Sequence, residues 1–209
     1  MNLQPGLRER KKQRTRETIA RAGHELFAER GYHATTLPDI AEKADVSTRT
    51  IFAYFPSKED ILFSEFALMK DALARALAER PDGQDTLETV RQFILSSHRV
   101  ERSELDEKLH LCVESDPTLR THLRARIAQL EELIAPAIAK DLGVRDGDVR
   151  PQVVAASLTA AFNALLEGGD GIKGKAYSTK DVAASIDPVI KFLRGGLDAL
   201  KEQRTKPRA

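Results

Sequence analysis

The chain has 209 residues, of which 41% are hydrophobic and 31% charged, so it is long enough to bury a core and differs from a disordered polyelectrolyte. Its single cysteine, Cys112, excludes an internal disulfide framework and favours a reducing compartment. No apolar stretch approaches the ~20 residues of a membrane helix, and residues 1–16 lack the apolar core of a secretory signal. We therefore expect a soluble, cytoplasmic protein without membrane contact.

The formal net charge of +1 conceals an uneven distribution along the chain. Residues 1–16 carry six Arg or Lys side chains and one Glu, a net charge of +5, so the remainder carries −4. We predict a basic disordered arm over residues 1–11. Such an arm suits contact with DNA phosphates, because neutralising a phosphate releases counterions, but a merely solvated terminus has the same composition.

The apolar residues indicate an all-α fold. Ala (27) and Leu (24) outnumber Val (10) and Ile (11), and apolar positions recur every three or four residues. Each early helix begins at a capping residue or ends at Gly or Pro. The predicted helices, with these residues in parentheses, are 11–30 (Gly31), 37–44 (Thr36 and Asp39), 48–55 (Ser47 and Pro56) and 58–80 (Ser57, Asp60 and Pro81).

Longer helices with fewer breaks follow. They are predicted over 86–100, 104–114, 117–142, 154–166 and from residue 178 onward. We expect Pro136 to kink 117–142 and Pro188 to interrupt the last helix, because proline removes a main-chain donor. The glycine-rich segment 168–177 is predicted to be a loop. The expected organisation is an N-terminal helical domain over 12–72, a larger helical domain over 73–203, and a tail over 204–209.

Residues 35–55 have the pattern of a helix-turn-helix. Ile40, Ala41, Val46, Ile51 and Phe55 are expected to face inward. The second helix of such a motif enters the major groove, where Arg49 is the one long donor available to a guanine. A helical hairpin whose polar face merely meets water is the alternative interpretation. The predicted DNA contacts are Arg14, Thr35, Thr36, Ser47, Thr48, Arg49, Thr50, Phe52, Tyr54 and Lys58.

The string GYHATTLPDIAEKADVSTRTIFAYFPSKEDIL (31–62) closely resembles the DNA-binding segment of TetR-family transcriptional repressors. The matching positions are Gly31-Tyr32, Thr35-Thr36, Ile40-Ala41, Ala44, Val46-Ser47, Tyr54-Phe55 and Ser57-Lys58-Glu59, and with the preceding helix the resemblance spans about 12–72. Arg49 stands where the family often has glycine and Phe52 where it often has tyrosine. For these two positions the family's contacts cannot be copied, and we interpret Phe52 as a packing or thymine-methyl contact.

The resemblance implies a homodimer whose larger C-terminal domain binds a small molecule and then releases a double-stranded DNA operator. Residues 116–139 and 192–200 resemble, more loosely, actinobacterial TetR regulators with acyl-CoA-like ligand domains, which implies an apolar or acyl-CoA-like effector. Candidate effector contacts are Phe66, Met69, Phe93, Leu109, Phe162 and Asn163. The apolar seams of the last two helices predict a dimer interface of Val154, Leu158, Phe162, Leu165, Ile190, Leu193 and Leu197.

The sequence gives little support for a metal site or for catalysis. His98, His110 and His122 are spaced by twelve residues, unlike ligands on one helix face, and Cys112 near His110 and Glu114 fits packing better than nucleophilic catalysis. We predict no metal site, no cofactor and no enzyme activity, and a sequence-specific regulator, most simply a repressor. Two alternatives remain open: a nucleoid-associated or division-control DNA-binding protein of the same fold, and a helical enzyme or carrier with an incidental hairpin.

Overall fold

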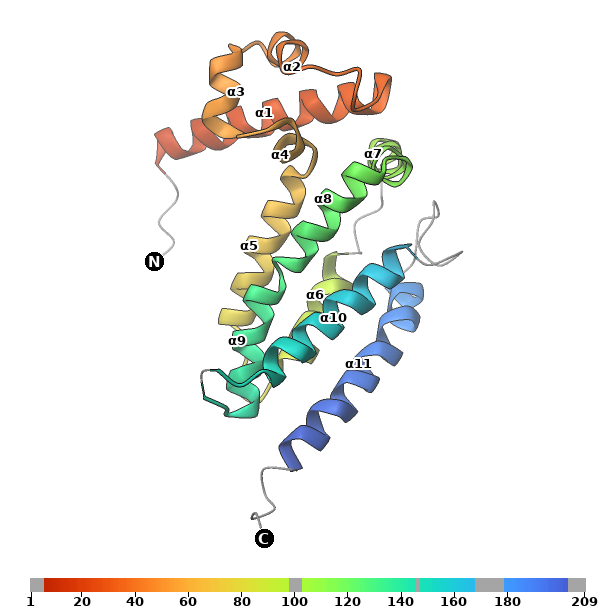
Figure 1. Cartoon of the computed structure of the whole chain (residues 1–209). Helices are drawn as coiled ribbons and strands as arrows, with labels where there is room; N and C mark the ends of the chain where they lie inside the picture. Colours follow the sequence, from red (N-terminus) through yellow and green to blue (C-terminus); the bar gives the residue numbers. More distant parts are fainter. Residues whose placement is uncertain (1–5, 98–102, 146, 168–178, 203–209) are drawn as a thin grey trace. The chain divides into compact units, whose positions relative to one another are not determined.

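A computed structural model describes residues 6–97, 103–145, 147–167 and 179–202 of the chain (Figure 1). All regular secondary structure in these ranges is helical, which confirms the all-α prediction. The described ranges leave out residues 1–5 of the predicted arm, the predicted glycine-rich loop and the predicted tail. They also leave out the side chains of Phe162 and Leu165.

The chain divides into two compact units, one of Met1–Leu68 with Arg102–His122 and one of Met69–Glu101 with Leu123–Ala209. This division differs from the predicted boundary at residues 72 and 73, because α7 packs against α1 and joins the N-terminal unit. The helices of the first unit are α1 (Leu7–Arg30), α2 (Leu37–Lys43), α3 (Thr48–Tyr54), α4 (Lys58–Leu62), the start of α5 (Ser64–Ala78), α7 (Glu104–Ser115) and the first half of α8 (Pro117–Ala128).

The core of the first unit is aliphatic and aromatic. The fully buried side chains include Ile19, Phe27, Ile40, Ile51, Phe55 and Ile61, drawn from α1, α2, α3 and α4 and from the residue that follows α3. Gly23 of α1 lies where α1 and α4 approach closely, because a Cβ at this position would collide with Cγ2 of Ile61. This close approach seats α4 directly on α1.

The second unit contains α6 (Thr86–Ser97), α9 (Glu131–Leu142), α10 (Arg150–Glu167), α11 (Thr179–Glu202) and the remainders of α5 and α8. Helix α10 packs against α9 and α11, and α6 packs against α11 and α9. The core side chains include Leu87, Ile127, Ile134, Ile138, Leu158 and Ile186.

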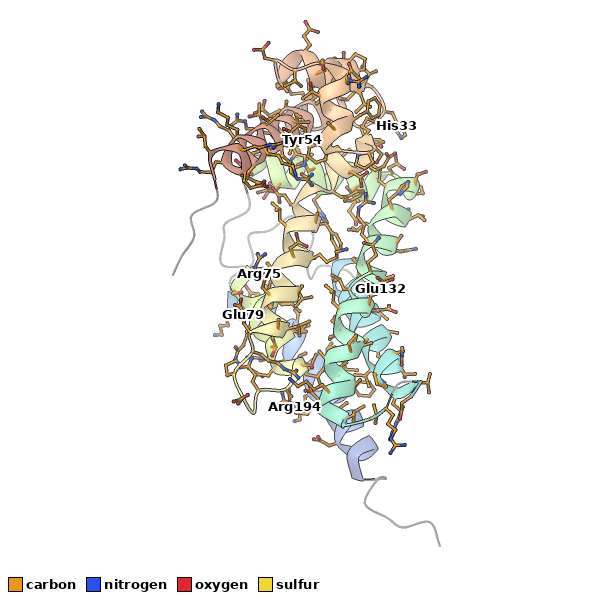
Figure 2. All side chains as sticks on the ribbon, turned by 90° about the vertical axis from the view of Figure 1, so that its left-hand side faces the viewer. His33, Tyr54, Arg75, Glu79, Glu132 and Arg194 are labelled. Carbon is orange, nitrogen blue, oxygen red and sulfur yellow. The ribbon has the colours of Figure 1, made fainter. Side chains whose placement is uncertain are left out.

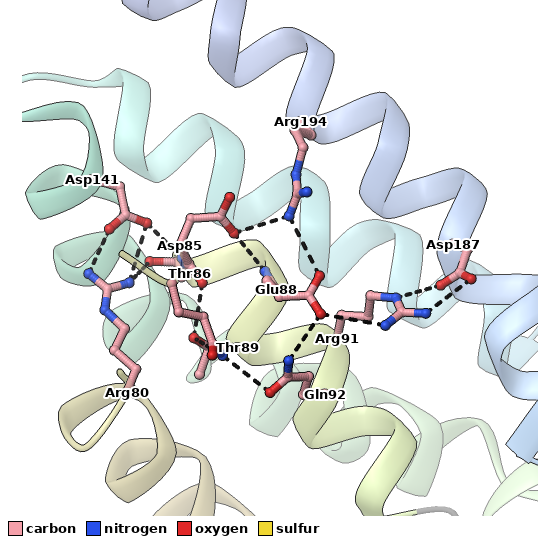
Figure 3. Close-up of polar contacts among 11 residues, drawn as sticks. Arg80, Asp85, Thr86, Glu88, Thr89, Arg91, Gln92, Asp141, Asp187 and Arg194 are labelled. Atoms are coloured by element: carbon pink, nitrogen blue, oxygen red, sulfur yellow. Dashed lines mark hydrogen bonds and ion pairs between the residues drawn. The ribbon is translucent and has the colours of Figure 1, made fainter. Parts of the chain in front are cut away.

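Polar side chains fasten α6 to its neighbours within the second unit (Figure 3). Arg80 pairs with Asp141 at 2.6 Å, and both side chains are about nine-tenths buried. The main-chain N–H of Thr86 donates to the same carboxylate at 2.7 Å. On the other side of α6, Arg91 donates to Asp187 of α11 at 2.7 Å. These pairs hold the position of α6 against α9 and α11.

Several helix boundaries differ from the prediction. Helix α1 begins at Leu7, so residues 7–11 of the predicted disordered arm are helical; this stretch is rich in Arg and Lys, which favour helix, with Glu9 in its first turn. The predicted helix 58–80 breaks at Phe63, and the predicted helix 117–142 breaks at residues 129 and 130 instead of at Pro136, which lies inside α9. Pro188 likewise lies inside α11 without interrupting it.

A buried histidine accounts for the break at Phe63. His24 of α1 places Nε2 at 2.9 Å from the carbonyl oxygen of Ile61 and 3.2 Å from that of Leu62. These carbonyls lie at the end of α4, where the chain turns into α5. The imidazole therefore supplies a hydrogen-bond partner at a helix end that would otherwise bury unsatisfied carbonyls.

Replacing Gly23 by alanine tests the close approach of α1 and α4. We expect Gly23→Ala to lower the free energy of unfolding by about 1–3 kcal/mol, because the new methyl group overpacks a fully buried contact. Thermal or urea unfolding measures the change. In an Ile61→Ala background, which removes Cγ2, the same substitution should cost markedly less. Equal costs in the two backgrounds would contradict this packing.

Candidate nucleic-acid interface

Helix α2 is fixed at its start by a reciprocal cap. The Thr36 main-chain N–H donates to Oδ2 of Asp39 at 2.8 Å, and the Asp39 N–H donates to the Thr36 hydroxyl at 3.3 Å. Hydrogen bonds from the hydroxyl and the amide of Thr36 hold the pKa of Asp39 below its ordinary value. This confirms the capping box that the sequence predicts and anchors the first helix of the motif.

The turn between α2 and α3 rests on a residue with left-handed backbone. Asp45 has a φ of 53°. Its N–H donates to the carbonyl of Glu42 at 3.1 Å, and the N–H of Val46 donates to that of Ala41 at 3.0 Å. This pair of bonds is the Schellman arrangement, which usually places glycine where Asp45 stands. It directs the chain from α2 into α3.

Helix α3 has a buried side and an exposed side. Ser47 caps it by accepting from the Thr50 N–H at 3.0 Å. Ile51, together with the C-cap residue Phe55, is completely buried. Arg49 and Ala53 are exposed, and Phe52 is 55% exposed although it is a large apolar residue. The exposed side of α3, which carries Arg49, Phe52 and Ala53, therefore faces away from the core.

Eight of the ten predicted DNA contacts are exposed or half-buried and are not used inside the domain. Thr36, Ser47, Arg49, Phe52 and Arg14 are exposed, and Thr48, Thr50 and Tyr54 are half-buried. The Ser47 and Thr50 hydroxyls also lie 2.7 Å from each other. Nitrogen-tipped side chains gather at the N-terminal end of α1 (Figure 2), where Arg8, Arg10, Lys11, Lys12 and Arg14 are all exposed. The basic residues predicted to meet phosphates thus lie largely on a helix.

Two of the predicted DNA contacts are used inside the domain instead. Thr35 is fully buried, and its hydroxyl donates to the Gly31 carbonyl at 2.9 Å, so it cannot reach DNA. The ammonium group of Lys58 donates to the carbonyls of Tyr32 and Thr35, both at 2.8 Å, and lies 4.0 Å from the centre of the Tyr32 ring. Burial lowers the pKa of Lys58 below its ordinary value, although neighbouring Glu59 opposes that shift. Lys58 therefore holds the loop between α1 and α2.

Three side chains that join elements of this unit are not predicted from the sequence. His24 contacts the end of α4, as described above, and Arg16 contacts the end of α3. His33 lies 2.6 Å from Asp116, between α7 and α8. Burial would raise the pKa of Asp116, but hydrogen bonds from His33 and from the amides of Leu119 and Thr118 outweigh it and leave the pKa lowered. No short-range sequence pattern predicts pairs between residues that lie so far apart in the chain.

The predicted effector contacts fall in both units. Phe66 and Leu109 belong to the first unit, whereas Met69, Phe93 and Asn163 belong to the second, and all five side chains are half-buried. Phe162 lies outside the described side chains. No helix in the described part of the chain is long and apolar enough to cross a membrane. Among the same residues, no group of three or more His, Cys, Asp or Glu side chains is arranged to hold a metal ion.

The predicted dimer-interface residues require a correction. Val154, Leu158, Ile190, Leu193 and Leu197 are all buried within a single chain. Their apolar seams pack α10 and α11 into the protomer's own core, so these side chains are not available to a partner. The exposed residues of the same two helices form a different set, which includes Gln152, Val153, Ala160, Ala184, Pro188, Phe192, Gly195, Gly196 and Ala199, together with the charged residues Lys180, Asp181, Lys191 and Asp198.

Helix α3 is capped at its start, is packed on the core of the N-terminal unit through one side and is exposed on the other. This arrangement is typical of helix-turn-helix DNA-binding proteins. Residues 19–64 match the family described as bacterial regulatory proteins, tetR family, and residues 84–198 match the MftR C-terminal domain. The chain belongs to the TetR family, whose members are DNA-binding regulators of transcription.

Individual relatives agree with this assignment. The HTH-type transcriptional regulator TcmR of Streptomyces glaucescens is 36% identical over 165 residues, which cover 75% of this chain and 73% of TcmR. MftR of Mycobacterium tuberculosis is 27% identical over 197 residues, which cover 92% of this chain and 96% of MftR.

Two solved structures share the fold at 21% identity. SmeT in complex with triclosan has a TM-score of 0.59 and matches 85% of this chain and 90% of SmeT. NalD of Pseudomonas aeruginosa has a TM-score of 0.58 and matches 86% of this chain and 96% of NalD.

The turn geometry predicts an unusual stabilising substitution. Asp45→Gly should raise the free energy of unfolding by about 1 kcal/mol, because glycine adopts a positive φ without the steric cost that a side chain incurs. The matching change in melting temperature is about 2–4 °C for a chain of this size. Glu42→Gly, at an exposed position inside α2, is the control and should lower stability. A loss of stability in Asp45→Gly would contradict the assigned turn.

Proposed function

We propose that this chain is a ligand-released repressor that binds a pseudo-palindromic DNA operator as a homodimer. The observation that supports this most directly is the open side of α3, where Arg49 and Phe52 stand exposed while Ile51 and Phe55 are fully buried behind them. A recognition helix needs this arrangement, because the buried side fixes its orientation while the other side enters the major groove.

The contacts that we propose divide into two kinds. Arg49 reads a guanine through its two acceptors, O6 and N7, and Phe52 contacts a thymine methyl group; Thr48 and Thr50 lie on the same helix within reach of bases or phosphates. Thr36 and Ser47 stand at the N-termini of α2 and α3, where main-chain N–H groups of the first turn suit phosphates. Tyr54 and the exposed cations of α1, Arg14 included, supply further phosphate contacts.

The homodimer that we propose forms through the exposed side of α10 and α11. Phe192 is 79% exposed and Val153 is 55% exposed, so both apolar side chains are available to a partner. Gly195 and Gly196 lie in mid-helix, where glycine is unfavourable, and a Cβ at either position would meet nothing within 4 Å in the same chain. The close approach of a second chain would explain both glycines. A twofold dimer then matches a pseudo-palindromic site.

The effector that we propose is apolar or acyl-CoA-like. In the second unit the apolar side chains of Met69, Leu77, Phe93 and Leu95 are only half-buried, and Asn163 adds an amide. Incompletely buried apolar groups suit an apolar ligand, and SmeT, which shares the fold, is solved with triclosan. Effector binding would tilt the segment 58–80 and separate the two recognition helices. Because coupling is reciprocal, operator DNA must weaken effector binding by the same factor, and this factor corresponds to a coupling free energy of about 1–3 kcal/mol.

Selection of duplexes from a random pool by the purified chain tests the DNA-binding proposal. We expect enrichment of an inverted repeat with a guanine in each half. Arg49→Ala should then cost about 1–3 kcal/mol on that repeat and relax the preference at one position in each half-site. Arg75→Ala, which removes an exposed cation of the second unit, is the control and should retain the preference. A pool without an enriched repeat would overturn the proposed function.

Sedimentation of a charged variant tests the proposed dimer interface. Phe192→Glu should convert the dimer to monomers, because it would bury a carboxylate on each side of an apolar contact. Val149→Glu places the same charge at a residue that is 66% exposed just before α10, and should leave the dimer intact. Dimers of Phe192→Glu at micromolar concentration would show that the interface lies elsewhere.

A further inference from the structure

The C-terminal end of α3 is short of hydrogen-bond donors. Phe55 donates its N–H to the carbonyl of Ile51 at 2.8 Å, but Pro56, which follows, has no N–H to offer. Helix α3 has no basic residue in its last turn. The partial negative charge of its last carbonyls is therefore not balanced by any cation of the helix itself.

Arg16 of α1 supplies the missing donor and the missing charge. Its Nη1 donates to the carbonyl oxygen of Tyr54, the last residue of α3, at 2.9 Å. The central carbon of the same guanidinium lies 4.3 Å from the centre of the Phe55 ring. Phe55 is completely buried, so the guanidinium rests on a fixed ring while it caps the helix. Figure 2 labels Tyr54 at this end of the helix.

Helix α1 gives this contact a rigid base. Arg16 stands three residues before Ile19, which is fully buried in the core of the unit, so the two lie on one face of α1. The start of α3 is held separately, by the turn at Asp45 and the Ser47 cap. Helix α3 is thus fastened at its start through α2 and at its end through Arg16.

We propose that Arg16 is a positioning residue for sequence recognition. It sets the angle at which α3 presents Arg49 and Phe52 to the bases, and it acts through Tyr54 and Phe55 without touching DNA. The inference rests on the proposed function, because it concerns the same surface. It assigns Arg16 a role different from that of the neighbouring basic residues of α1, which we assign to phosphates.

Arg14 provides a matched comparison on the same helix. Arg14 is exposed, and the contact described for it uses only its main-chain carbonyl, which accepts from the Thr18 hydroxyl at 2.9 Å. A phosphate contact contributes equally to all sequences and to the dependence of affinity on salt. A positioning residue contributes to the selected sequence alone, because misplacement of α3 harms base contacts and leaves general attraction to DNA intact.

The experiment measures the affinity of the full chain for the selected repeat and for an unrelated duplex over a range of KCl concentrations. Arg16→Gln should lower affinity for the selected repeat at least about tenfold, the scale of a lost base contact, while affinity for the unrelated duplex and the salt slope stay unchanged. Arg14→Gln should lower both affinities together and reduce the slope by about 0.9 per lost phosphate contact. Arg16→Lys keeps the charge without the planar stack and should fall between wild type and Arg16→Gln.

The outcomes separate this inference from the proposed function. If wild type selects no sequence, both are overturned. If wild type is selective and Arg16→Gln behaves like Arg14→Gln, Arg16 is a phosphate contact and the positioning role is wrong. Circular dichroism checks folding; should Arg16→Gln unfold, the ratio of the two affinities for Arg16→Lys decides, and a ratio equal to that of wild type would overturn the inference.

Discussion

The DNA-binding surface depends on burying one side of a helix that is too short to be stable alone. Helix α3 has seven residues, and isolated helices of that length are unstable in water. Ile51 within it and Phe55 at its end are fully buried against the core that Ile19, Phe27 and Ile40 complete. Burying a side chain of this size contributes about 1.5–3 kcal/mol, so tertiary packing is what makes α3 a helix. Because the buried side stabilises α3, its exposed side is available for contacts with DNA.

The local signals in the sequence predicted this unit well. Capping residues and turn residues act over three or four positions, so Thr36, Ser47 and Ser57 announce the starts of α2, α3 and α4. The buried positions of α2 and α3 also follow from periodicity. What periodicity cannot provide is the partner of a polar side chain. Thr35 and Thr36 are adjacent and of the same type. Thr35 is nevertheless buried and donates to a main-chain carbonyl, whereas Thr36 caps α2.

The predicted dimer seam shows the same limit on a larger scale. Leu193 and Leu197 have the spacing of an intermolecular seam, but the same spacing serves packing within one chain, and here both residues are buried in the protomer. Phe192, Gly195 and Gly196 lie on the exposed side of α11 instead. Helix breaks at Phe63 and after Ala128 were also missed, because no glycine or proline marks either position.

The second unit combines a firm polar frame with incompletely buried apolar groups. The pair between Arg80 and Asp141 is almost fully desolvated, and removing one partner of such a pair commonly costs 3–5 kcal/mol, roughly speaking. Arg91 and Asp187 join α6 to α11 with less burial. Phe93, on the same helix as Arg91, is half-buried.

Methylation protection on the selected duplex shows which groove the protein occupies, because dimethyl sulfate modifies guanine N7 in the major groove and adenine N3 in the minor groove. If two copies of α3 occupy the major groove, guanines should be protected in two clusters related by a dyad. The centres of the clusters should lie about 34–36 Å apart or a multiple of that distance. Unprotected guanines with altered adenine N3 reactivity would contradict this account.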